Sequence, residues 1–157
     1  MTEPNATNAD NQGAIPLENV IEFRVRYAET DQMGVVYHAN YFAYFEMGRT
    51  ELLRQTTGVS YRELEESNLM MAVVKLDCSY HKPACYDDWL TLRTRVTRVS
   101  RASLEHEYTL FRGSELLAVG HTRMATLEKS TGRVVPVPLW LRQLRRPTLE
   151  ELGGEKE

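Results

Sequence analysis

The chain has 157 residues, of which 42% are hydrophobic and 26% are charged, and this balance is typical of one folded domain. The formal net charge of −3 argues against nucleic acid as the main partner. No apolar run approaches the roughly 18 residues of a membrane span, and the polar N-terminus lacks the apolar segment of a signal peptide. Two isolated cysteines, Cys78 and Cys85, are typical of reduced thiols. These features predict a soluble, cytoplasmic domain.

The two ends of the chain differ in composition from the segment between them. Residues 1–16 are rich in Asn, Asp, Thr and Gly, and this composition predicts a disordered N-terminal tail. Residues 147–157 are charged and contain Gly153 and Gly154, which predicts a flexible C-terminal tail. One folded domain is therefore expected over residues 17–146.

The first predicted element is a strand over residues 21–27. Apolar and charged residues alternate there without a break, which is typical of a half-buried strand. The residues expected on its inward face are Ile21, Phe23, Val25 and Tyr27.

A long helix is predicted over residues 41–55. Asn40 is a favourable N-cap, and apolar residues then recur at helical spacing. Gly48 interrupts the apolar face at a cost of about 1 kcal/mol in helix propensity, which indicates close packing of the helix against a flat surface. Gly58 is a typical helix end, and Ser60 with Glu63 forms a capping-box pattern that predicts a short helix over residues 60–67.

Four strands with period-two alternation follow, over residues 74–81, 90–97, 104–110 and 116–127. Gly120 lies inside the last of them and indicates a bulge or a close approach. Residues 139–145 predict a short terminal helix or strand. The connections between strands are short, so neighbouring strands must be antiparallel.

The predicted fold class is α+β, with a five-stranded antiparallel sheet wrapped around one long central helix. The helix covers only part of such a sheet. Association through an edge strand or through the outer sheet face is therefore expected.

One motif spans the junction between the first strand and the long helix. It reads Y-x-x-T-D-x-x-G-x-V-Y-H-A-x-Y from Tyr27, and the helix continues as Y-F-A-Y-F-E-M-G-R-T-E from Tyr41. This pattern resembles the hotdog-fold acyl-CoA thioesterases of the 4-hydroxybenzoyl-CoA thioesterase family, and most of all their YbgC-like branch. The matching positions are Tyr27, Thr30, Asp31, Gly34, Val36, Tyr37, His38, Ala39, Tyr41, Phe45, Glu46, Arg49 and Glu51.

The resemblance covers about residues 20–140 and continues weakly through the later strands. It implies the wrapped-helix hotdog fold. It also implies a homo-oligomer, either a dimer or a dimer of dimers, in which the active sites lie at the subunit interface and bind acyl-CoA with both chains.

Thioester hydrolysis needs a group that stabilises the carbonyl oxygen and a nucleophile that reaches the carbonyl carbon. The backbone N–H groups of about Tyr37 to Tyr41, at the start of the long helix, are candidates for the first role. The resemblance favours Asp31 as the catalytic carboxylate, either as a nucleophile that forms an anhydride or as a general base for water. The alternative is that Asp31 only holds a turn. His38 is predicted to orient the thioester or to donate to its carbonyl, with a local structural hydrogen bond as the alternative.

The predicted substrate-binding residues are Tyr27, Gly34, Val36, Tyr37, Tyr41 and Glu46. Gly34 suits a positive φ or a close approach of the acyl chain. The tyrosines are either pocket residues or simple core. Glu46 is the rival catalytic base, because another branch of hotdog thioesterases uses a helix carboxylate, and its structural alternative is an ion pair with Arg49.

The phosphates of coenzyme A need basic residues or N–H donors at the mouth of the site. The predicted CoA-binding residues, which fall at strand ends, are His81, Lys82, Arg101 and Ser103. Arg93, Arg95 and Arg98 form a basic stripe along one strand, with a solvated sheet face as its simpler interpretation. The spacing of the four histidines matches no compact zinc pattern, so no metal and no cofactor are expected beyond the CoA part of the substrate.

Two other functions use the same fold. A dehydratase or hydratase would pair His38 with Glu46 and leave Asp31 without a role, and a non-catalytic protein would only bind acyl-CoA. The acyl group, the choice between CoA and acyl-carrier-protein thioesters, and the choice between dimer and tetramer are left open by the sequence.

Overall fold

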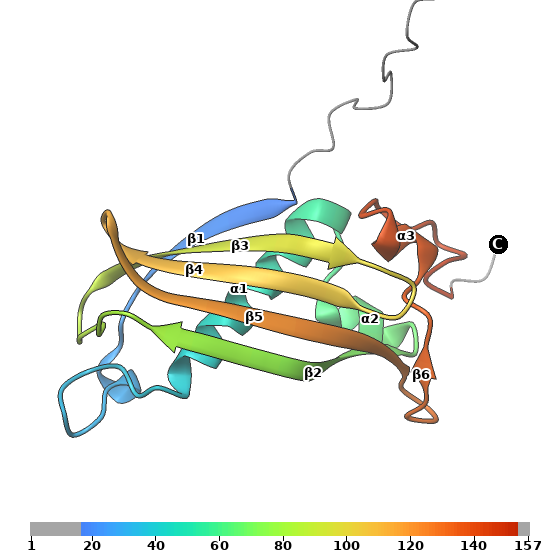
Figure 1. Ribbon diagram of the computed structural model, residues 1–157. Coiled ribbons are helices and arrows are strands. Elements are labelled where there is room, and N and C mark those ends of the chain that lie inside the picture. Colours follow the sequence, from blue (N-terminus) through green and yellow to red (C-terminus); the bar gives the residue numbers. More distant parts are fainter. Residues whose placement is uncertain (1–16, 154–157) are drawn as a thin grey trace, which may run out of the picture.

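The computed structural model describes residues 17–153 (Figure 1), so the predicted tail over residues 1–16 lies outside the described residues. Its elements are β1 (Glu18–Arg24), the 3-10 turn η1 (Tyr27–Glu29), α1 (Asn40–Thr57), α2 (Tyr61–Glu66), β2 (Leu69–Tyr80), β3 (Trp89–Val99), β4 (Leu104–Arg112), β5 (Glu115–Glu128), β6 (Val134–Val135) and α3 (Leu139–Arg142). No helix in this range is both long and apolar enough to cross a membrane.

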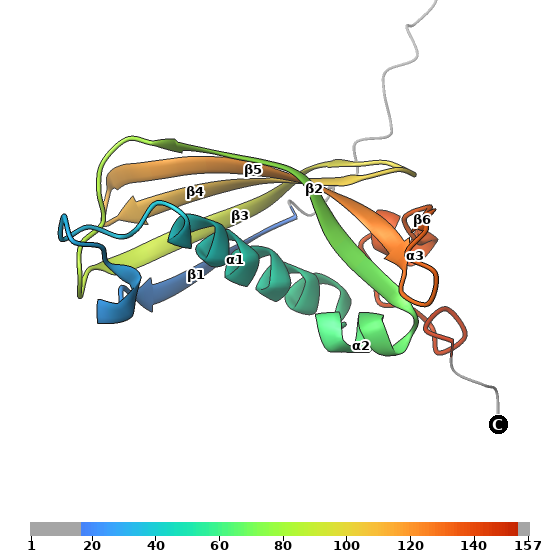
Figure 2. The same cartoon turned by 90° about the horizontal axis from the view of Figure 1, so that it is seen from below.

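The strands form one antiparallel sheet in the order β1-β3-β4-β5-β2, and this sheet curves over α1 (Figures 1 and 2). The chain enters α1 after one edge strand, β1, and passes through α2 into the other edge strand, β2. This is the predicted α+β hotdog fold, which is confirmed. The short strand β6, which pairs with β5, was not predicted, because two residues before Pro136 are too few to show alternation.

Two glycines allow α1 to lie directly on the sheet. A Cβ atom at Gly48 would lie 2.2 Å from Oγ1 of Thr94, and one at Gly120 would lie 2.2 Å from the ring of Phe45. Real Cβ atoms do not approach other atoms so closely, so glycine is required at both points. The close packing predicted for Gly48, and the close approach given as one alternative for Gly120, are therefore confirmed.

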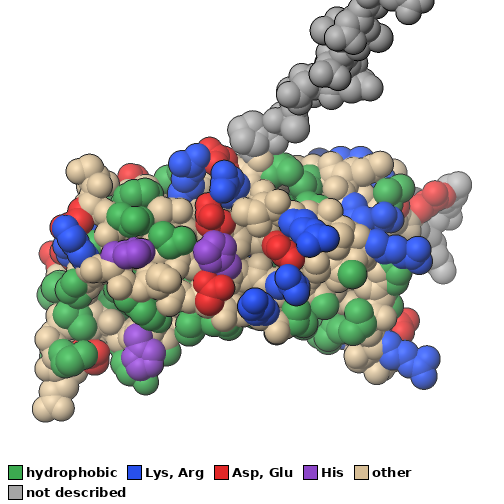
Figure 3. Space-filling view, viewed as in Figure 1, with side chains coloured by type: hydrophobic (Ala, Val, Ile, Leu, Met, Phe, Trp, Pro, Cys, Tyr) green, Lys and Arg blue, Asp and Glu red, His purple; other side chains and the backbone are tan. Residues whose placement is uncertain are grey.

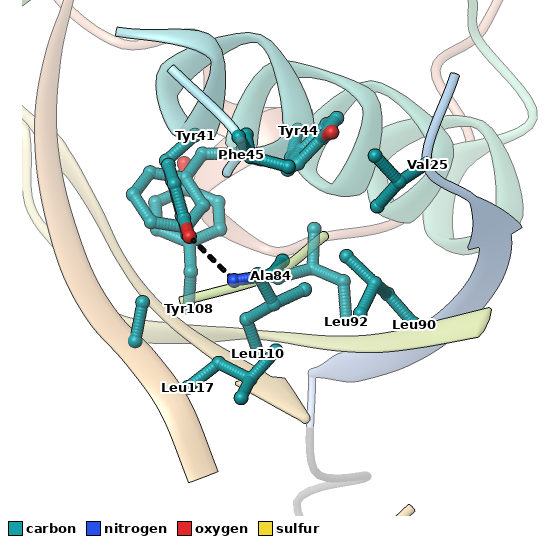
Figure 4. Close-up of a cluster of buried hydrophobic side chains, with 12 residues drawn as sticks. Val25, Tyr41, Tyr44, Phe45, Ala84, Leu90, Leu92, Tyr108, Leu110 and Leu117 are labelled. Atoms are coloured by element: carbon teal, nitrogen blue, oxygen red, sulfur yellow. Dashed lines mark hydrogen bonds between the residues drawn. The ribbon is translucent and has the colours of Figure 1, made fainter. Parts of the chain in front are cut away.

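The main core joins the inward face of α1 to the sheet. Figure 4 shows Tyr41, Tyr44 and Phe45 of α1 above leucines of the strands. The same cluster contains Val36, Ala84 and Val25, which lie outside the regular elements. The loops before α1 and after β2 are therefore tied to the core at one end of the sheet.

A second cluster closes the other end of the sheet. It joins Leu64 of α2 to Trp140 and Leu141 of α3, and Leu152 packs against it. Glu151 also forms an ion pair with Arg145 at 2.6 Å. The packing therefore continues beyond residue 146, where the flexible tail was expected to begin.

The outer face of the sheet carries many charged side chains (Figure 3). Arg93 pairs with Glu18 at 2.8 Å, and Arg95 pairs with Glu107 at 2.9 Å. The basic stripe is therefore at least partly neutralised by carboxylates on neighbouring strands, as a solvated sheet face would be.

Three expectations about element boundaries were wrong. Tyr27 does not end the inward face of β1, because the chain leaves the strand at Arg24 and forms η1, where the Tyr27 side chain is 78% exposed. Asn40 is the first helical residue and not the N-cap, since its side chain instead donates to the Glu29 carbonyl at 2.8 Å. β2 begins at Leu69, five residues before residue 74, because the apolar run that opens it does not alternate.

The short helices α2 and α3 lie where the sequence predicted them. The capping box of α2 is present, with the Glu63 N–H donating to Ser60 Oγ at 3.2 Å and the Ser60 N–H donating to Glu63 Oε2 at 2.7 Å. The terminal element is the short helix α3, one of the two alternatives predicted for residues 139–145.

Candidate active site

A tight turn between η1 and α1 positions Asp31. The Asp31 N–H donates to the Val35 carbonyl at 2.9 Å, and the Gly34 N–H donates to the Asp31 carbonyl at 3.0 Å. The Asp31 side chain accepts a hydrogen bond from the Met33 N–H through Oδ1 at 2.8 Å. Gly34 has a φ of +81° and no atom within 4 Å of a built Cβ, so it is required for its backbone conformation and not for close approach.

The end of this turn is bound to the loop that follows β2. The Val36 N–H donates to the Ala84 carbonyl at 2.8 Å, and Val35 forms an isolated bridge with Cys85. The Val36 side chain is buried in the main core. The turn and the β2–β3 loop therefore form one wall, although about 50 residues separate them in the sequence.

A cavity of about 260 Å³ lies between these two segments. It is lined by Asp31, Met33, Val35, Val36, His38, Tyr41, Tyr80, His81, Lys82 and Pro83. The structure thus brings together six of the predicted site residues: Asp31, Val36, His38, Tyr41, His81 and Lys82. The other four lining residues, Met33, Val35, Tyr80 and Pro83, were not among the predicted site residues.

The start of α1 offers free backbone donors beside this cavity. The N–H groups of Tyr37 and Asn40 are used, by the Glu29 and Tyr37 carbonyls respectively. The N–H groups of His38, Ala39 and Tyr41 have no acceptor within residues 17–153. Three of the five predicted oxyanion donors are therefore available at the positive end of an 18-residue helix.

Asp31 itself is only partly engaged. Its Oδ1 holds the turn, whereas Oδ2 has no hydrogen-bond partner and the carboxylate has no ion pair in the described part of the chain. The turn role, which was predicted as the alternative to catalysis, is present in the structure, and the residue also lines the cavity. One carboxylate oxygen is therefore available for chemistry at the cavity.

Tyr80 links the cavity wall to the start of α1. Its hydroxyl donates to the His38 carbonyl at 2.7 Å, and its ring lies edge-on against Tyr41 at 4.9 Å. Partial burial, with smaller contributions from Cys78 and Tyr41, raises the pKa of Tyr80 to about 12. The hydroxyl therefore stays protonated and able to donate at neutral pH. In the sequence Tyr80 is only the last apolar residue of an alternating strand.

Two other predicted residues have structural contacts of their own. The Tyr41 hydroxyl accepts a hydrogen bond from the Ala84 N–H at 3.4 Å (Figure 4), so this tyrosine is both core and cavity wall. Tyr37 is 46% exposed, lies against the His38 ring at 4.4 Å and does not line the cavity.

The remaining predicted residues lie away from the cavity. Tyr27 is exposed and packs edge-on against Tyr86 at 5.6 Å. The Glu46 side chain is 68% exposed on α1, and its partner is Arg49 at 4.0 Å, which is the ion pair given as its structural alternative.

Arg101 and Ser103 lie in the connection between β3 and β4. That connection is at the opposite end of the sheet from the β2–β3 loop that lines the cavity (Figure 1). A single chain therefore does not bring Arg101 and Ser103 to Asp31.

Two further sequence expectations concern thiols and metals. Cys78 and Cys85 are free thiols. Within residues 17–153 no group of three or more His, Cys, Asp or Glu side chains is arranged to hold a metal ion.

Comparison with known proteins shows the family to which the chain belongs. Residues 33–119 match the family model of the thioesterase superfamily. The acyl-CoA thioesterase YbgC of Haemophilus influenzae is 37% identical over 123 residues, which cover 77% of this chain and 89% of that protein. A putative esterase of Aquifex aeolicus is 32% identical over 115 residues, which cover 73% of this chain and 88% of that protein.

Solved structures show the same fold. A protein from Thermus thermophilus superposes with a TM-score of 0.75 at 34% identity, over 80% of this chain and 95% of that one. A DHNA-CoA thioesterase from Staphylococcus aureus superposes with a TM-score of 0.75 at 29% identity, over 80% of this chain and 85% of that one. The resemblance carried by residues 27–51 is confirmed, and the chain belongs to the thioesterase superfamily.

Proposed function

We propose that this chain hydrolyses acyl-CoA thioesters to a free acid and a thiol, and that the reaction takes place in the Asp31 cavity. The observation that carries the proposal is one cavity lined by Asp31, which keeps a free carboxylate oxygen, and by His38 and Tyr41, whose N–H groups at the helix start have no acceptor within residues 17–153. The likeness to relatives named acyl-CoA thioesterases supports the same reaction class.

In the proposed mechanism the thioester carbonyl oxygen accepts hydrogen bonds from N–H groups among His38, Ala39 and Tyr41. One such donor typically lowers the barrier by about 3 kcal/mol, because it is oriented before charge develops on the oxygen. His38, which lines the cavity, places the thioester by donating to it from the imidazole.

Asp31 acts by one of two routes. As a nucleophile, its free oxygen attacks the carbonyl carbon and the C–S bond breaks, which leaves a mixed anhydride and a thiolate that takes a proton from water. Water then hydrolyses the anhydride and restores the carboxylate. As a general base, Asp31 takes a proton from a water molecule that attacks the same carbon, the C–S bond breaks, and the thiolate takes up the proton that Asp31 then releases. Both routes consume one water and give the same products.

We propose further that the working unit is a homodimer, or a dimer of dimers, with the site at the subunit interface. β2 is an edge strand with an open side, and it carries the exposed side chains of Val73, Val74 and Leu76. Its last residue, Tyr80, lines the cavity, so a second chain added to this edge would lie next to the site. Arg101, which is exposed, and Ser103, which is partly buried, lie at the far end of the sheet, so they could reach a site only on another chain. The free thiols suit work in the cytoplasm.

A panel of acyl-CoA thioesters with a thiol reagent tests the proposal. We expect release of free CoA from at least one member, with acyl groups small enough for a cavity of about 260 Å³ cleaved fastest. Hydration of an enoyl-CoA without thiol release would instead indicate a hydratase. Tight binding of acyl-CoA without any release would indicate a binding protein. Either result would contradict the proposed function.

A further inference from the structure

A chain of charged side chains lies at the mouth of the cavity. Lys82 lines the cavity, and its side chain is 58% exposed. Its Nζ donates to Oε2 of Glu115, the first residue of β5, at 2.8 Å. Among the residues that line the cavity in the described part of the chain, Lys82 is the one lysine or arginine.

Glu115 has a second cationic partner, and that partner is firmly held. Arg112 donates through Nη2 to the other Glu115 oxygen, Oε1. It also donates through Nη1 to Asp88 Oδ2 at 2.6 Å and to the Pro83 carbonyl at 3.2 Å. Asp88 Oδ2 in turn accepts the Cys85 N–H at 2.8 Å. Among the described residues Arg112 is therefore fixed by three acceptors, whereas the Lys82 ammonium has a single one.

This difference in the number of acceptors determines that the Lys82–Glu115 pair, and not the Arg112–Glu115 pair, is the one that can separate. If Lys82 leaves Glu115, the glutamate keeps Arg112 and is not left as an unpaired charge. The Lys82 side chain is 58% exposed and that of Glu115 is 34% exposed, and ion pairs that solvent reaches in this way contribute little to stability. Lys82 can therefore exchange partners at low cost, while the Arg112 contacts keep the cavity wall at Pro83 in place.

A phosphate ester is the partner that suits an exposed lysine at this mouth. A phosphodiester carries one negative charge and a terminal phosphate monoester close to two, and both accept strong, charge-assisted hydrogen bonds from an ammonium group. Thioesters of phosphopantetheine carry such a phosphate on the thiol arm, whether the arm belongs to coenzyme A or to a carrier protein. Burial is not needed for the exchange, because the arm would approach from the solvent side of the cavity.

We propose that Glu115 is a resident counter-ion of Lys82, which the substrate phosphate displaces, so that Glu115 sets the affinity of the site for phosphate-bearing thioesters. The inference rests on the proposed function and adds a residue that limits substrate binding. Glu115 does not touch the reacting atoms. Its effect is confined to the binding of the phosphate.

The test uses one acyl group on three thiols: coenzyme A, 4′-phosphopantetheine and pantetheine, which lacks phosphate. Glu115→Gln is expected to lower KM for acyl-CoA roughly two- to fivefold, the range of an exposed ion pair, with kcat unchanged. The KM for acyl-pantetheine is expected to stay the same. The glutamine amide oxygen still accepts from Arg112, so the wall at Pro83 is preserved.

Lys82→Met is the second variant of the test. Lys82→Met is expected to raise KM for acyl-CoA. In the double variant Lys82→Met/Glu115→Gln, the second change is expected to lower KM no further, because the lysine it would release is absent. If Glu115→Gln lowers KM for both acyl-CoA and acyl-4′-phosphopantetheine, the contact lies at the phosphate of the pantetheine arm, which carrier proteins share. A gain for acyl-CoA alone would place it at the nucleotide phosphates. Both outcomes support the counter-ion exchange.

Glu65→Gln is the matched control, because Glu65 forms an exposed pair with Lys129 at 3.7 Å away from the cavity. It changes the net charge equally and is expected to leave every KM unchanged. An unchanged acyl-CoA KM in Glu115→Gln, or an equal gain for acyl-pantetheine, would overturn the inference. If the wild type released no thiol from any thioester, the proposed function would fail. Calorimetric binding of CoA to the wild type and Glu115→Gln would then still decide the counter-ion exchange.

Discussion

Asp31 uses one of its two carboxylate oxygens to hold the turn that precedes α1. The hydrogen bond from the Met33 N–H fixes the orientation of the carboxylate, and the second oxygen is left without a partner in the described residues. A catalytic carboxylate benefits from both features, since a fixed orientation reduces the entropy lost when the substrate binds. The turn contact therefore supports the proposed catalytic role.

Tyr80 controls a peptide unit that matters for the proposed oxyanion site. Its hydroxyl donates to the His38 carbonyl, and this carbonyl belongs to the same planar peptide as the Ala39 N–H. The Tyr80 hydroxyl thus orients one of the free donors. We expect Tyr80→Phe to lower kcat roughly 2- to 10-fold, the range of one neutral hydrogen bond, with a smaller effect on KM.

Steady-state thiol release by the purified variant measures this effect. Tyr86→Phe is the control, because Tyr86 is exposed and contacts Tyr27 outside the cavity. A Tyr80→Phe enzyme with wild-type kcat would show that the hydroxyl does not position the donor.

At the scale of elements, the contact between α1 and the sheet sets where the helix begins and so where its free donors lie. Gly120 of β5 leaves room for the ring of Phe45, which also stacks on Tyr108 at 4.5 Å. The Asp77 carbonyl, 3.0 Å from a built Cβ at Gly120, closes the other side. Neither neighbour can move far, because the ring is fully buried and the carbonyl belongs to β2.

We therefore expect Gly120→Ala to lower the free energy of unfolding by roughly 1–3 kcal/mol, the usual range for overpacking. Phe45→Leu should relieve the clash, so the double variant should be more stable than the sum of the two single changes predicts. Urea denaturation of the four proteins measures both quantities. Additive losses, or no loss in Gly120→Ala, would mean that the ring is not what excludes a side chain at this position.

The sequence shows the elements but not the contacts between distant segments. The alternating strands, the helix with Gly48 and the capping box at Ser60 depend on local patterns, and each was predicted. Lys82 was predicted from its place at a strand end, but the position of Tyr80 beside Asp31 depends on where β2 ends relative to α1, and no local pattern contains that information.

The wrong boundaries have the same cause. Alternation of apolar residues continues through Val25 to Tyr27, but the strand ends earlier because Val25 exchanges backbone hydrogen bonds with Asp87 and Asp88. Asn40 has the side chain of an N-cap, but a carbonyl 11 residues earlier in the chain binds it instead. In both cases a tertiary contact overrides a local preference.

At the scale of the whole molecule, the sheet has two edge strands, and only β2 is proposed to pair with a second chain. Val74 of β2 is 59% exposed and lies on the proposed dimer edge, whereas Val20 of β1 is 54% exposed on the opposite edge. We expect Val74→Lys to shift the protein toward monomers, because a charge on an edge strand opposes pairing with a second strand. Activity per chain should fall with the dimer fraction if the second chain completes the site.

Light scattering coupled to size-exclusion chromatography, together with thiol release, measures both effects. Val20→Lys introduces the same charge on the other edge and should keep the wild-type mass and activity. A Val74→Lys monomer with full activity would show that one chain is sufficient for the site.

The central claim is that Asp31 carries the hydrolysis, and the most direct measurement compares thiol release by Asp31→Asn and Glu46→Gln under identical conditions. Both variants replace one carboxylate by an amide, so circular dichroism and unfolding curves can confirm equal folding. We predict that Asp31→Asn loses roughly 10²- to 10⁴-fold in kcat and that Glu46→Gln stays within about twofold of the wild type. A folded Asp31→Asn enzyme with wild-type turnover, or a collapse of turnover in Glu46→Gln alone, would contradict the account.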